Sequence, residues 1–468
     1  MKLVFHNDKN NVFFGDIMFL ENYNFTKERN KMKITIAGGG STWTPGLLHS
    51  IAKHKEQFPV EELVLYDNNE ERQEVIGEFA KILYNEKYPE LKFSYTTDVK
   101  EAFKNVDYVF CQIRTGGYEM REQDEKIPLS MGLIGQETVG AGGFAYGFRS
   151  IPDMIKLVND IREQSPNAWI LNYTNPAAIV AVALKSEFPN DDRILNICDQ
   201  PVNLLKSYAK LLNMDYHDFE PYYFGLNHYG WFTKLLDKEG NDLLPGLINQ
   251  IKDEGFLPAD AEQRDQSWLN TYGMVQKMVE DFDDYLPNTY LQYYLYPKYK
   301  LSKLDPNYTR ANEVMDGREK RVFEDAKKVI QTGSIENSKT VFNDAHGDMI
   351  VEIAMSIEYN LHNYFIIITQ NNGIVNNLSD DVMIECTATL GKNGPRPFAI
   401  GNIGTFYKGM IEPQYAYEKL ITEAYYEKSY NKLLQALTLN RTINDANDAR
   451  KILDKLIEAN KKYWVDVK

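Results

Sequence analysis

The chain has 468 residues, enough to bury a large core, and this length suggests an enzyme subunit of two or three domains, or of one large α/β body with an appended half. Its 52 basic and 67 acidic side chains give a formal net charge of −15, which excludes a basic surface for nucleic acid and attraction to an anionic membrane. No apolar run is long enough to span a bilayer and no signal-peptide pattern opens the chain, so we expect a cytoplasmic protein. The three cysteines are far apart, which argues against a disulfide framework and for a reducing compartment.

Residues 1–31 mix aromatic side chains with Asn, Asp and Lys and show neither a helical nor a strand period. A clean strand then begins at Met32. We therefore expect residues 1–31 to be a disordered extension, or a segment added by a mis-annotated upstream start codon.

Short apolar runs alternate with stretches of helical apolar spacing from Met32 to about Gln200. The runs read KITIAGGG, EELVLYD, VDYVFCQI, AWILNYT and RILNICD, and the helical stretches include residues 72–88, 150–164 and 175–188. Strands that alternate with helices predict a parallel, doubly wound sheet. We therefore predict an α/β fold with a Rossmann-like nucleotide-binding domain over residues 32–200.

The pattern changes after residue 200. Long amphipathic helices are predicted over residues 267–282, 312–331 and 418–437, with strand-like segments between them. We predict that residues 201–468 form a second, mixed α+β domain that carries substrate, metal and oligomer contacts.

The segment AGGGSTWTPG, residues 37–46, follows a strand and leads into a helix. In that setting glycines let backbone amides and a helix N-terminus hold a pyrophosphate. Asp67 closes the next strand, where a carboxylate accepting from a ribose hydroxyl favours NAD over NADP. Trp43 occupies the third glycine position, so a tight turn that binds no ligand is the alternative. The candidate cofactor-binding residues are Gly38, Gly39, Gly40, Ser41, Thr42 and Asp67.

Two further motifs, NICDQP and GLNHYGW, contain Cys198 and His228. A thiolate and an imidazole suit a first-row transition metal, and two protein ligands would leave open positions for a substrate. A catalytic metal is therefore more plausible than a structural one, although a lone cysteine or histidine is more often simply packed in the core.

Asp199 could act as a general acid if its surroundings keep it protonated, or it could only cap the helix that follows. Tyr290 lies in the motif YLQYYLYP, where a tyrosine near a cation could act as a base and the others would pack. Arg121 and Arg310 could together clamp a phosphate, although each alone would be read as a surface ion-pair residue.

Several uncommon motifs occur in one order: KITIAGGGSTWTPG, the segment over residues 113–152 that begins IRTGGYEMREQDEK, NYTNPAAI, NICDQP, GLNHYGW and YLQYYLYP. Over nearly the whole chain after Met32, this order resembles glycoside hydrolase family 4, the NAD- and divalent-metal-dependent 6-phospho-glycosidases. An ordered series of this kind is far more specific than a dinucleotide-binding fingerprint alone.

The resemblance implies a Rossmann domain joined to a second domain over the active site, with NAD and usually Mn²⁺, or else Co²⁺ or Ni²⁺. In this family NAD⁺ takes hydride from C3 of the sugar, and a base then removes the acidified C2 proton while the metal stabilises the developing charge. The leaving group departs from C1, water adds back and the hydride returns. The two-carboxylate mechanism of most glycosidases does not apply.

By matching motifs, the resemblance implies that Cys198 and His228 bind the metal. It assigns protonation of the leaving oxygen to Asp199 and removal of the C2 proton to Tyr290, with two neighbouring tyrosines of the same motif as alternatives. The remaining implied substrate contacts are Arg121, Asn175 and Arg310.

The sequence CD at the metal-binding cysteine resembles the α-specific members of the family. We therefore expect a 6-phospho-α-glucosidase that acts on maltose 6′-phosphate or a related phosphorylated disaccharide, and that forms a homo-oligomer. Gln200 departs from the α-type motif, which usually has Met there, and puts the aglycone preference in question.

The alternatives within the family are a 6-phospho-β-glucosidase and an α-galactosidase or glucuronidase. An NAD-dependent 2-hydroxy acid dehydrogenase or a non-catalytic NAD sensor would share the glycine turn, but each would leave NICDQP and GLNHYGW unexplained.

Overall fold

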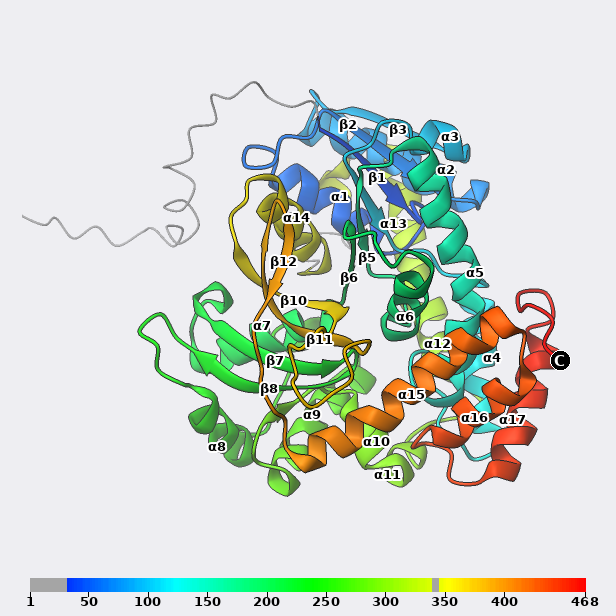
Figure 1. Cartoon of the computed structure of the whole chain (residues 1–468). Helices are drawn as coiled ribbons and strands as arrows, with labels where there is room; N and C mark the ends of the chain where they lie inside the picture. Colours follow the sequence, from blue (N-terminus) through cyan, green and yellow to red (C-terminus); the bar gives the residue numbers. More distant parts are fainter. Residues whose placement is uncertain (1–31, 339–344) are drawn as a thin grey trace, which may run out of the picture.

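The computed structural model describes residues 32–338 and 345–468, and the prediction for residues 1–31 lies outside this part of the chain. Six parallel strands form the first half of one sheet, in the order β3-β2-β1-β4-β5-β6 (Figure 1). These strands are β1 (Lys33–Ala37), β2 (Glu62–Tyr66), β3 (Lys92–Thr96), β4 (Tyr108–Cys111), β5 (Trp169–Asn172) and β6 (Ile194–Ile197). All five predicted strands are therefore confirmed, and the parallel α/β class is correct.

Helices connect these strands, as the alternating pattern predicted. They are α1 (Thr44–Lys53), α2 (Glu70–Lys87), α3 (Val99–Ala102), α4 (Gly117–Leu129), α5 (Gly140–Gln164) and α6 (Ala177–Glu187), followed by α7 (Gln200–Leu212). The core strands are almost wholly apolar because helices cover both faces of the parallel sheet.

The sheet continues into the second half of the chain through antiparallel strands. These are β7 (Glu220–Leu226), β8 (Tyr229–Leu236), β9 (Leu286–Pro287), β10 (Asn363–Gln370), β11 (Met383–Gly391) and β12 (Gly394–Pro397). β10 pairs with β6, β11 with β10, β7 with β11 and β8 with β7, which gives a 12-stranded sheet in the described part of the chain. The predicted domain boundary near Gln200 is thus crossed by one continuous sheet, and the division into two domains stays a prediction.

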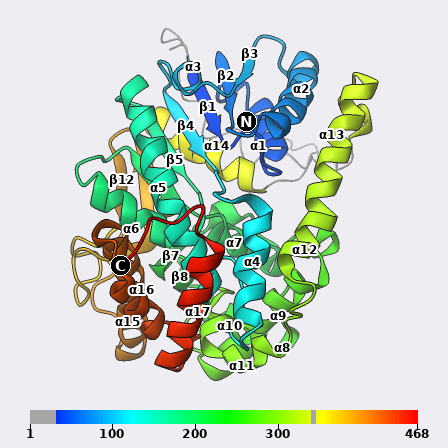
Figure 2. The ribbon, with the colours of Figure 1, turned by 90° about the vertical axis from the view of Figure 1, so that its right-hand side faces the viewer.

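The second half contributes further helices around these strands. They are α8 (Leu244–Glu254), α9 (Gln266–Asp281), α10 (Leu291–Leu295), α11 (Pro297–Leu301), α12 (Arg310–Val314), α13 (Lys320–Thr332), α14 (Ala345–Glu358), α15 (Thr405–Glu427), α16 (Tyr430–Leu439) and α17 (Ala446–Ala459). A π-helical turn, Met315–Glu319, joins α12 to α13, so the helix predicted over residues 312–331 runs through with one irregularity. Figure 2 shows α12 beside α4 and α13 reaching up to α2.

The single helix predicted over residues 418–437 is wrong, because the chain forms two helices there. α15 ends at Glu427, and Lys428 adopts a left-handed backbone conformation with φ of 52°. Ser429 then caps α16 by accepting a hydrogen bond from the backbone NH of Lys432. The apolar period continues through the break, which is why it did not reveal the turn. Among the described residues, no helix is both long and apolar enough to cross a membrane.

Two polar side chains of the parallel strands satisfy each other. The Asn172 amide at the end of β5 donates to Asn196 Oδ1 on β6 at 2.8 Å, and Asn172 Oδ1 accepts from the backbone NH of Thr174 at 3.2 Å. Both asparagines are buried. Asn172 therefore ties the ends of neighbouring strands together.

A buried carboxyl group in α15 makes the stability of this fold pH-dependent. Glu418 is 1% exposed, and burial raises its pKa to about 8. Gln414 donates to its Oε1 at 2.9 Å, whereas Oε2 has no hydrogen-bond partner within the described residues. Between the ordinary pKa near 4.5 and about 8, the folded state binds a proton that the unfolded chain releases, so this group destabilises the fold increasingly as pH rises.

Glu418→Gln is expected to remove this contribution, because the amide stays uncharged at every pH. The melting temperature of the variant relative to the native chain should therefore increase between pH 6 and pH 9, as measured by calorimetry. A difference that does not change with pH would contradict the assignment.

Candidate active site

The carboxyl end of β6 and the turn between β7 and β8 bring two predicted metal ligands together. Cys198 follows β6, and His228 occupies the hairpin turn with φ of 61°. Their Sγ and Nε2 atoms are 3.5 Å apart, and the two side chains are 6% and 7% exposed. The structure thus joins residues thirty positions apart in one buried pair.

The tautomer of His228 follows from its hydrogen bonds. Thr138 Oγ1 donates its only proton to Gln136 Oε1 at 2.9 Å, and that same oxygen also accepts from the Thr138 backbone NH at 2.6 Å. At 3.2 Å from the Thr138 hydroxyl, His228 Nδ1 must therefore carry the proton. Burial lowers the pKa of His228 to about 4, so the neutral ring presents the Nε2 lone pair toward Cys198.

Negative groups gather around this pair. Burial raises the pKa of the Cys198 thiol well above its ordinary value, and the nearby Glu385 and Asp199 raise it further, while a hydrogen bond from the Asn227 amide opposes them. A bound cation would offset this accumulated charge and favour the thiolate. No cluster of three or more His, Cys, Asp or Glu side chains with a metal-binding arrangement occurs within residues 32–338 and 345–468. The donors fit a divalent metal held by two protein ligands with open positions for a substrate.

Tyr290 lies directly on the histidine. Its ring stacks on the His228 imidazole with centroids 4.0 Å apart and an interplanar angle of 6°. Tyr293 is one ring further away, 6.0 Å from Tyr290, and Tyr294 packs edge-on against Tyr229 in the core. Of these three tyrosines, Tyr290 is therefore the best placed to act beside a metal. Burial, Glu137 and neighbouring groups raise its pKa well above the ordinary value.

Asp199 stands at the N-cap position of α7, but its side chain makes no capping hydrogen bond, so the capping interpretation is wrong. Its Oδ2 instead accepts from the Asn203 amide at 3.2 Å. The next residue, Gln200, donates to Thr289 Oγ1 at 2.7 Å and so ties the start of α7 to the residue before Tyr290. The residue that departs from the expected motif thus contacts the segment that carries the candidate base.

Arg121 and Arg310 come from helices that the structure joins. Glu125 accepts from Arg121 Nε at 2.9 Å through one oxygen and from the backbone NH of Ala311 at 2.7 Å through the other, which links α4 to α12. Arg121 is 5% exposed, whereas Arg310 is one-third exposed. Each guanidinium is paired with carboxylates, Arg310 with Glu313 at 2.6 Å and with a second acid, so the phosphate clamp stays a proposal.

Glu137 is a site residue that the sequence reasoning missed. Its Oε2 lies 2.9 Å from Arg114 and 3.2 Å from Arg121. Although burial opposes it, the two arginine charges lower the pKa of Glu137 to about 2. Glu137 and its partner Arg114 both lie inside the segment over residues 113–152 that carried the resemblance. Helix α4 separates them in the chain, so only the fold shows that they pair.

The side-chain oxygen of Asn175 lacks a hydrogen-bond donor among the described residues. Its Oδ1 is buried and has no hydrogen-bond partner in the described part of the chain. A buried amide oxygen without a donor loses the stabilisation of a hydrogen bond, so it is a natural acceptor for a ligand hydroxyl.

The glycine turn fits a dinucleotide. Gly38 has φ of 90°, and a Cβ there would lie 2.7 Å from the Gln112 carbonyl oxygen, so a larger residue would not fit. Asp67 Oδ2 accepts from the Gly40 NH at 2.8 Å, which places this carboxylate against the turn with lone pairs left for a ribose hydroxyl. The turn then enters the N-terminus of α1 at Trp43.

The turn is covered by a residue from the second half of the chain. The Arg318 guanidinium lies 4.2 Å from the Trp43 ring centroid and donates to Tyr118 Oη at 3.1 Å. Tyr118 Oη is in turn 3.3 Å from Thr42 Oγ1. The tryptophan that breaks the glycine fingerprint thus serves as a contact for the π-helical turn.

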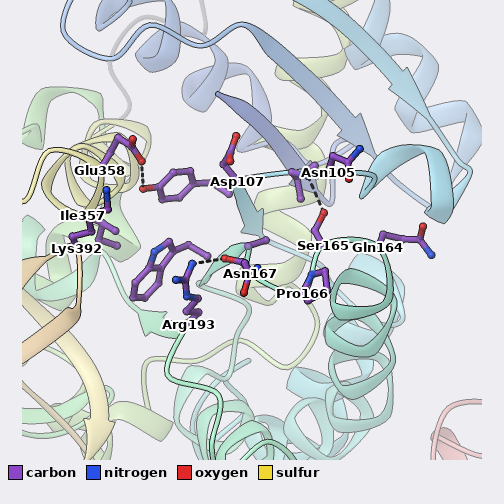
Figure 3. Close-up of a pocket in the computed structure, with 14 residues that line it drawn as sticks. Asn105, Asp107, Gln164, Ser165, Pro166, Asn167, Arg193, Ile357, Glu358 and Lys392 are labelled. Atoms are coloured by element: carbon purple, nitrogen blue, oxygen red, sulfur yellow. Dashed lines mark hydrogen bonds between the residues drawn. The ribbon is translucent and has the colours of Figure 1, made fainter. Parts of the chain in front are cut away.

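A separate pocket lies at the opposite edge of the sheet, at the amino ends of β4, β5 and β6 (Figure 3). Its lining includes Asp107, Arg193 and Lys392. Tyr108 donates to Glu358 at 3.1 Å across this pocket. It contains none of the predicted site residues.

Comparison with known proteins identifies the family to which this chain belongs. The sequence matches the family described as Family 4 glycosyl hydrolase over residues 33–214, and the Family 4 glycosyl hydrolase C-terminal domain over residues 223–443. The chain belongs to glycosyl hydrolase family 4. The first of these segments contains Cys198 and the second contains His228.

This family 4 chain is 51% identical over 439 residues to the phospho-α-glucosidase PagL of Clostridium acetobutylicum, an alignment that covers 93% of this chain and 99% of the relative. A solved 6-phospho-α-glucosidase from gut microorganisms, in complex with NAD and Mn²⁺, is 57% identical with a TM-score of 0.92, covering 94% of this chain and 100% of that one. The 6-phospho-β-glucosidase of Thermotoga maritima, solved with manganese, NAD⁺ and glucose-6-phosphate, is 28% identical with a TM-score of 0.80, covering 93% and 100%.

The hydrogen bond to Thr138 generates a prediction for metal binding by the family 4 chain. Thr138→Val keeps the shape of the side chain but removes the acceptor that fixes the His228 tautomer, so Mn²⁺ affinity should fall about 10- to 100-fold. Thr138→Ser keeps the hydroxyl and is the matched control. Titration of Mn²⁺ followed by electron paramagnetic resonance measures both, and equal affinities for Val and Ser would contradict the role of this hydroxyl.

Proposed function

We propose that this protein hydrolyses 6-phospho-α-glucosides such as maltose 6′-phosphate and releases glucose 6-phosphate. The reaction uses NAD and a divalent metal, with Mn²⁺ as the preferred ion. The observation that carries the proposal is the stack of Tyr290 on His228, whose Nε2 faces Cys198 beside Asp199. The buried pair of metal donors thereby lies beside a half-buried candidate base and a half-buried candidate acid. The phospho-α-glucosidase relatives support the α-specificity.

The residues present fit both cofactors. NAD would lie on the glycine turn and against Asp67, and the metal would be held by Cys198 and His228. When bound, the nicotinamide supplies reversible oxidation of a sugar carbon and the metal supplies Lewis-acid polarisation of neighbouring oxygens.

The proton transfers belong to Tyr290, which stacks on His228, and to Asp199, which follows Cys198 in the chain. Tyr290 takes the C2 proton, and a nearby cation would lower its raised pKa toward the working range. Asp199 holds the proton that the leaving sugar oxygen needs when the bond at C1 breaks. Elimination requires this pairing of a base at C2 with an acid at the leaving group, and no nucleophile at C1.

Substrate binding is assigned to Arg121, Arg310 and Asn175. The arginines supply the positive charge that a 6-phosphate requires in a chain whose net charge is −15, and their carboxylate partners hold the guanidinium groups in place. The unsatisfied Asn175 oxygen accepts from a sugar hydroxyl.

A substrate panel tests the proposal. p-Nitrophenyl α- and β-glucoside 6-phosphates, their unphosphorylated counterparts and maltose 6′-phosphate are incubated with Mn²⁺, NAD⁺ and a thiol reductant. We expect the phosphorylated α-glucosides to be cleaved at least 100-fold more efficiently than the others, and activity to disappear on chelation. Preference for the β-anomer would make the protein a 6-phospho-β-glucosidase, and NADH accumulation without sugar release would make it a dehydrogenase. Whether the chain forms a homo-oligomer stays a prediction.

The acid role of Asp199 predicts a dependence on the leaving group. Asp199→Asn should reduce turnover of maltose 6′-phosphate by about 10²- to 10⁴-fold, because a sugar alcohol leaves poorly without a proton. The loss on p-nitrophenyl α-glucoside 6-phosphate should be under about tenfold, since nitrophenolate leaves unaided. Equal losses on the two substrates, measured as kcat, would remove Asp199 from this role.

The base role of Tyr290 predicts solvent exchange at C2. Hydrolysis in D₂O should give glucose 6-phosphate with deuterium at C2, because the tyrosine hydroxyl exchanges its proton with water, while C3 keeps its protium. Tyr290→Phe should lose most turnover and still bind NAD and Mn²⁺, whereas Tyr294→Phe, whose ring packs on Tyr229, should retain turnover. Product without C2 deuterium, by NMR before any isomerisation, would exclude elimination.

A further inference from the structure

Glu385, the third residue of β11, is a buried carboxylate that the proposed reaction does not use. Its side chain is 0% exposed, and burial raises its pKa to about 7. Among the described residues, no lysine, arginine or histidine forms an ion pair with it. Burial of a carboxylate without an ion-pair partner costs free energy, so the hydrogen bonds that offset this cost indicate the role of the residue.

One carboxylate oxygen holds the turn that carries a metal donor. Glu385 Oε1 accepts from Asn227 Nδ2 at 2.9 Å, and the same Asn227 amide hydrogen-bonds the sulfur of Cys198. Asn227 precedes His228, whose left-handed backbone is unfavourable for a residue other than glycine and needs such support. The register Glu385 opposite Gly225 places the carboxylate beside this turn. We call this contact the Asn227 arm.

The other oxygen leads to the candidate base. Glu385 Oε2 accepts from Tyr223 Oη at 3.1 Å, and that phenol oxygen accepts from Asn288 Nδ2 at 3.3 Å. Asn288 Oδ1 in turn accepts from the backbone NH of Tyr290 at 3.0 Å. Tyr223 and Asn288 are both 0% exposed. We call this chain of contacts the Tyr223 arm.

We infer that Glu385 is a positioning residue that sets the metal-donor pair and Tyr290 in register through two separate arms of one carboxylate. The inference rests on the proposed function for the roles of Cys198, His228 and Tyr290. Its specific content is that the two arms control different steps: the Asn227 arm controls metal affinity, and the Tyr223 arm controls removal of the C2 proton.

Three variants separate the arms. Asn227→Ala cuts only the first, and Mn²⁺ affinity measured by electron paramagnetic resonance should fall about 10- to 100-fold. Tyr223→Phe cuts only the second, so Mn²⁺ affinity should stay within about twofold of the native value. In that variant kcat should fall about tenfold or more, and the kinetic isotope effect with C2-deuterated substrate should increase, because proton removal becomes more rate-limiting.

Glu385→Gln disturbs both arms and should show both effects, at saturating Mn²⁺ and NAD⁺ for the kinetic part. Glu418→Gln, another buried glutamate remote from these hydrogen bonds, is the matched control and should change neither readout. Native metal affinity together with a native isotope effect in Glu385→Gln would overturn the inference.

Two further outcomes keep the test decisive. If Glu385→Gln unfolds, the single-arm variants carry the test, and loss of both properties together in Asn227→Ala and Tyr223→Phe would overturn the separation of the arms. If the native protein cleaves no phosphorylated glucoside, the proposed function fails, yet the Mn²⁺ titrations of Asn227→Ala against Tyr223→Phe still decide whether the first arm holds the metal pair.

Discussion

The antiparallel pairing of β10 with β6 determines where the functional side chains lie. β6 ends at Ile197, directly before Cys198, and its register with β10 is set at Ile367 opposite Ile197. Because β11 and β7 follow in the same sheet, the β7–β8 turn is carried back over the end of β6. A shift of one residue in this pairing would turn every strand side chain to the other face and separate the cysteine from His228.

The charges around Cys198 and His228 favour the binding of a cation. Burial raises the pKa of both Cys198 and Glu385, and the charge of the neighbouring Asp199 raises each of them further. Arg121 is held by ion pairs to Glu125 and Glu137, whereas no lysine, arginine or histidine among the described residues forms an ion pair with Glu385. A divalent cation would supply positive charge here without adding another titrating side chain.

The sequence indicated the parallel strands, the glycine turn and the donor pair because each leaves a local trace: an apolar run, a glycine cluster or an uncommon dipeptide. It did not show the break at Lys428, since the apolar period persists through a one-residue change of backbone conformation. It also missed Glu385, whose hydrogen-bond partners Tyr223 and Asn227 lie 162 and 158 positions away in the chain. A charged residue inside the apolar run MIECTATLG was the available signal, but only the fold shows which groups it contacts.

The two candidate metal donors are divided between the two segments that match the family. Cys198 belongs to the segment over residues 33–214 and His228 to that over residues 223–443, so neither segment owns a complete site. A gene rearrangement that exchanged one segment for a distant counterpart would have to preserve the sheet register and a 3.5 Å separation at once. Replacement of one segment alone is therefore expected to separate the two donors, whereas substitutions around the junction leave the pairing of β6 with β10 intact.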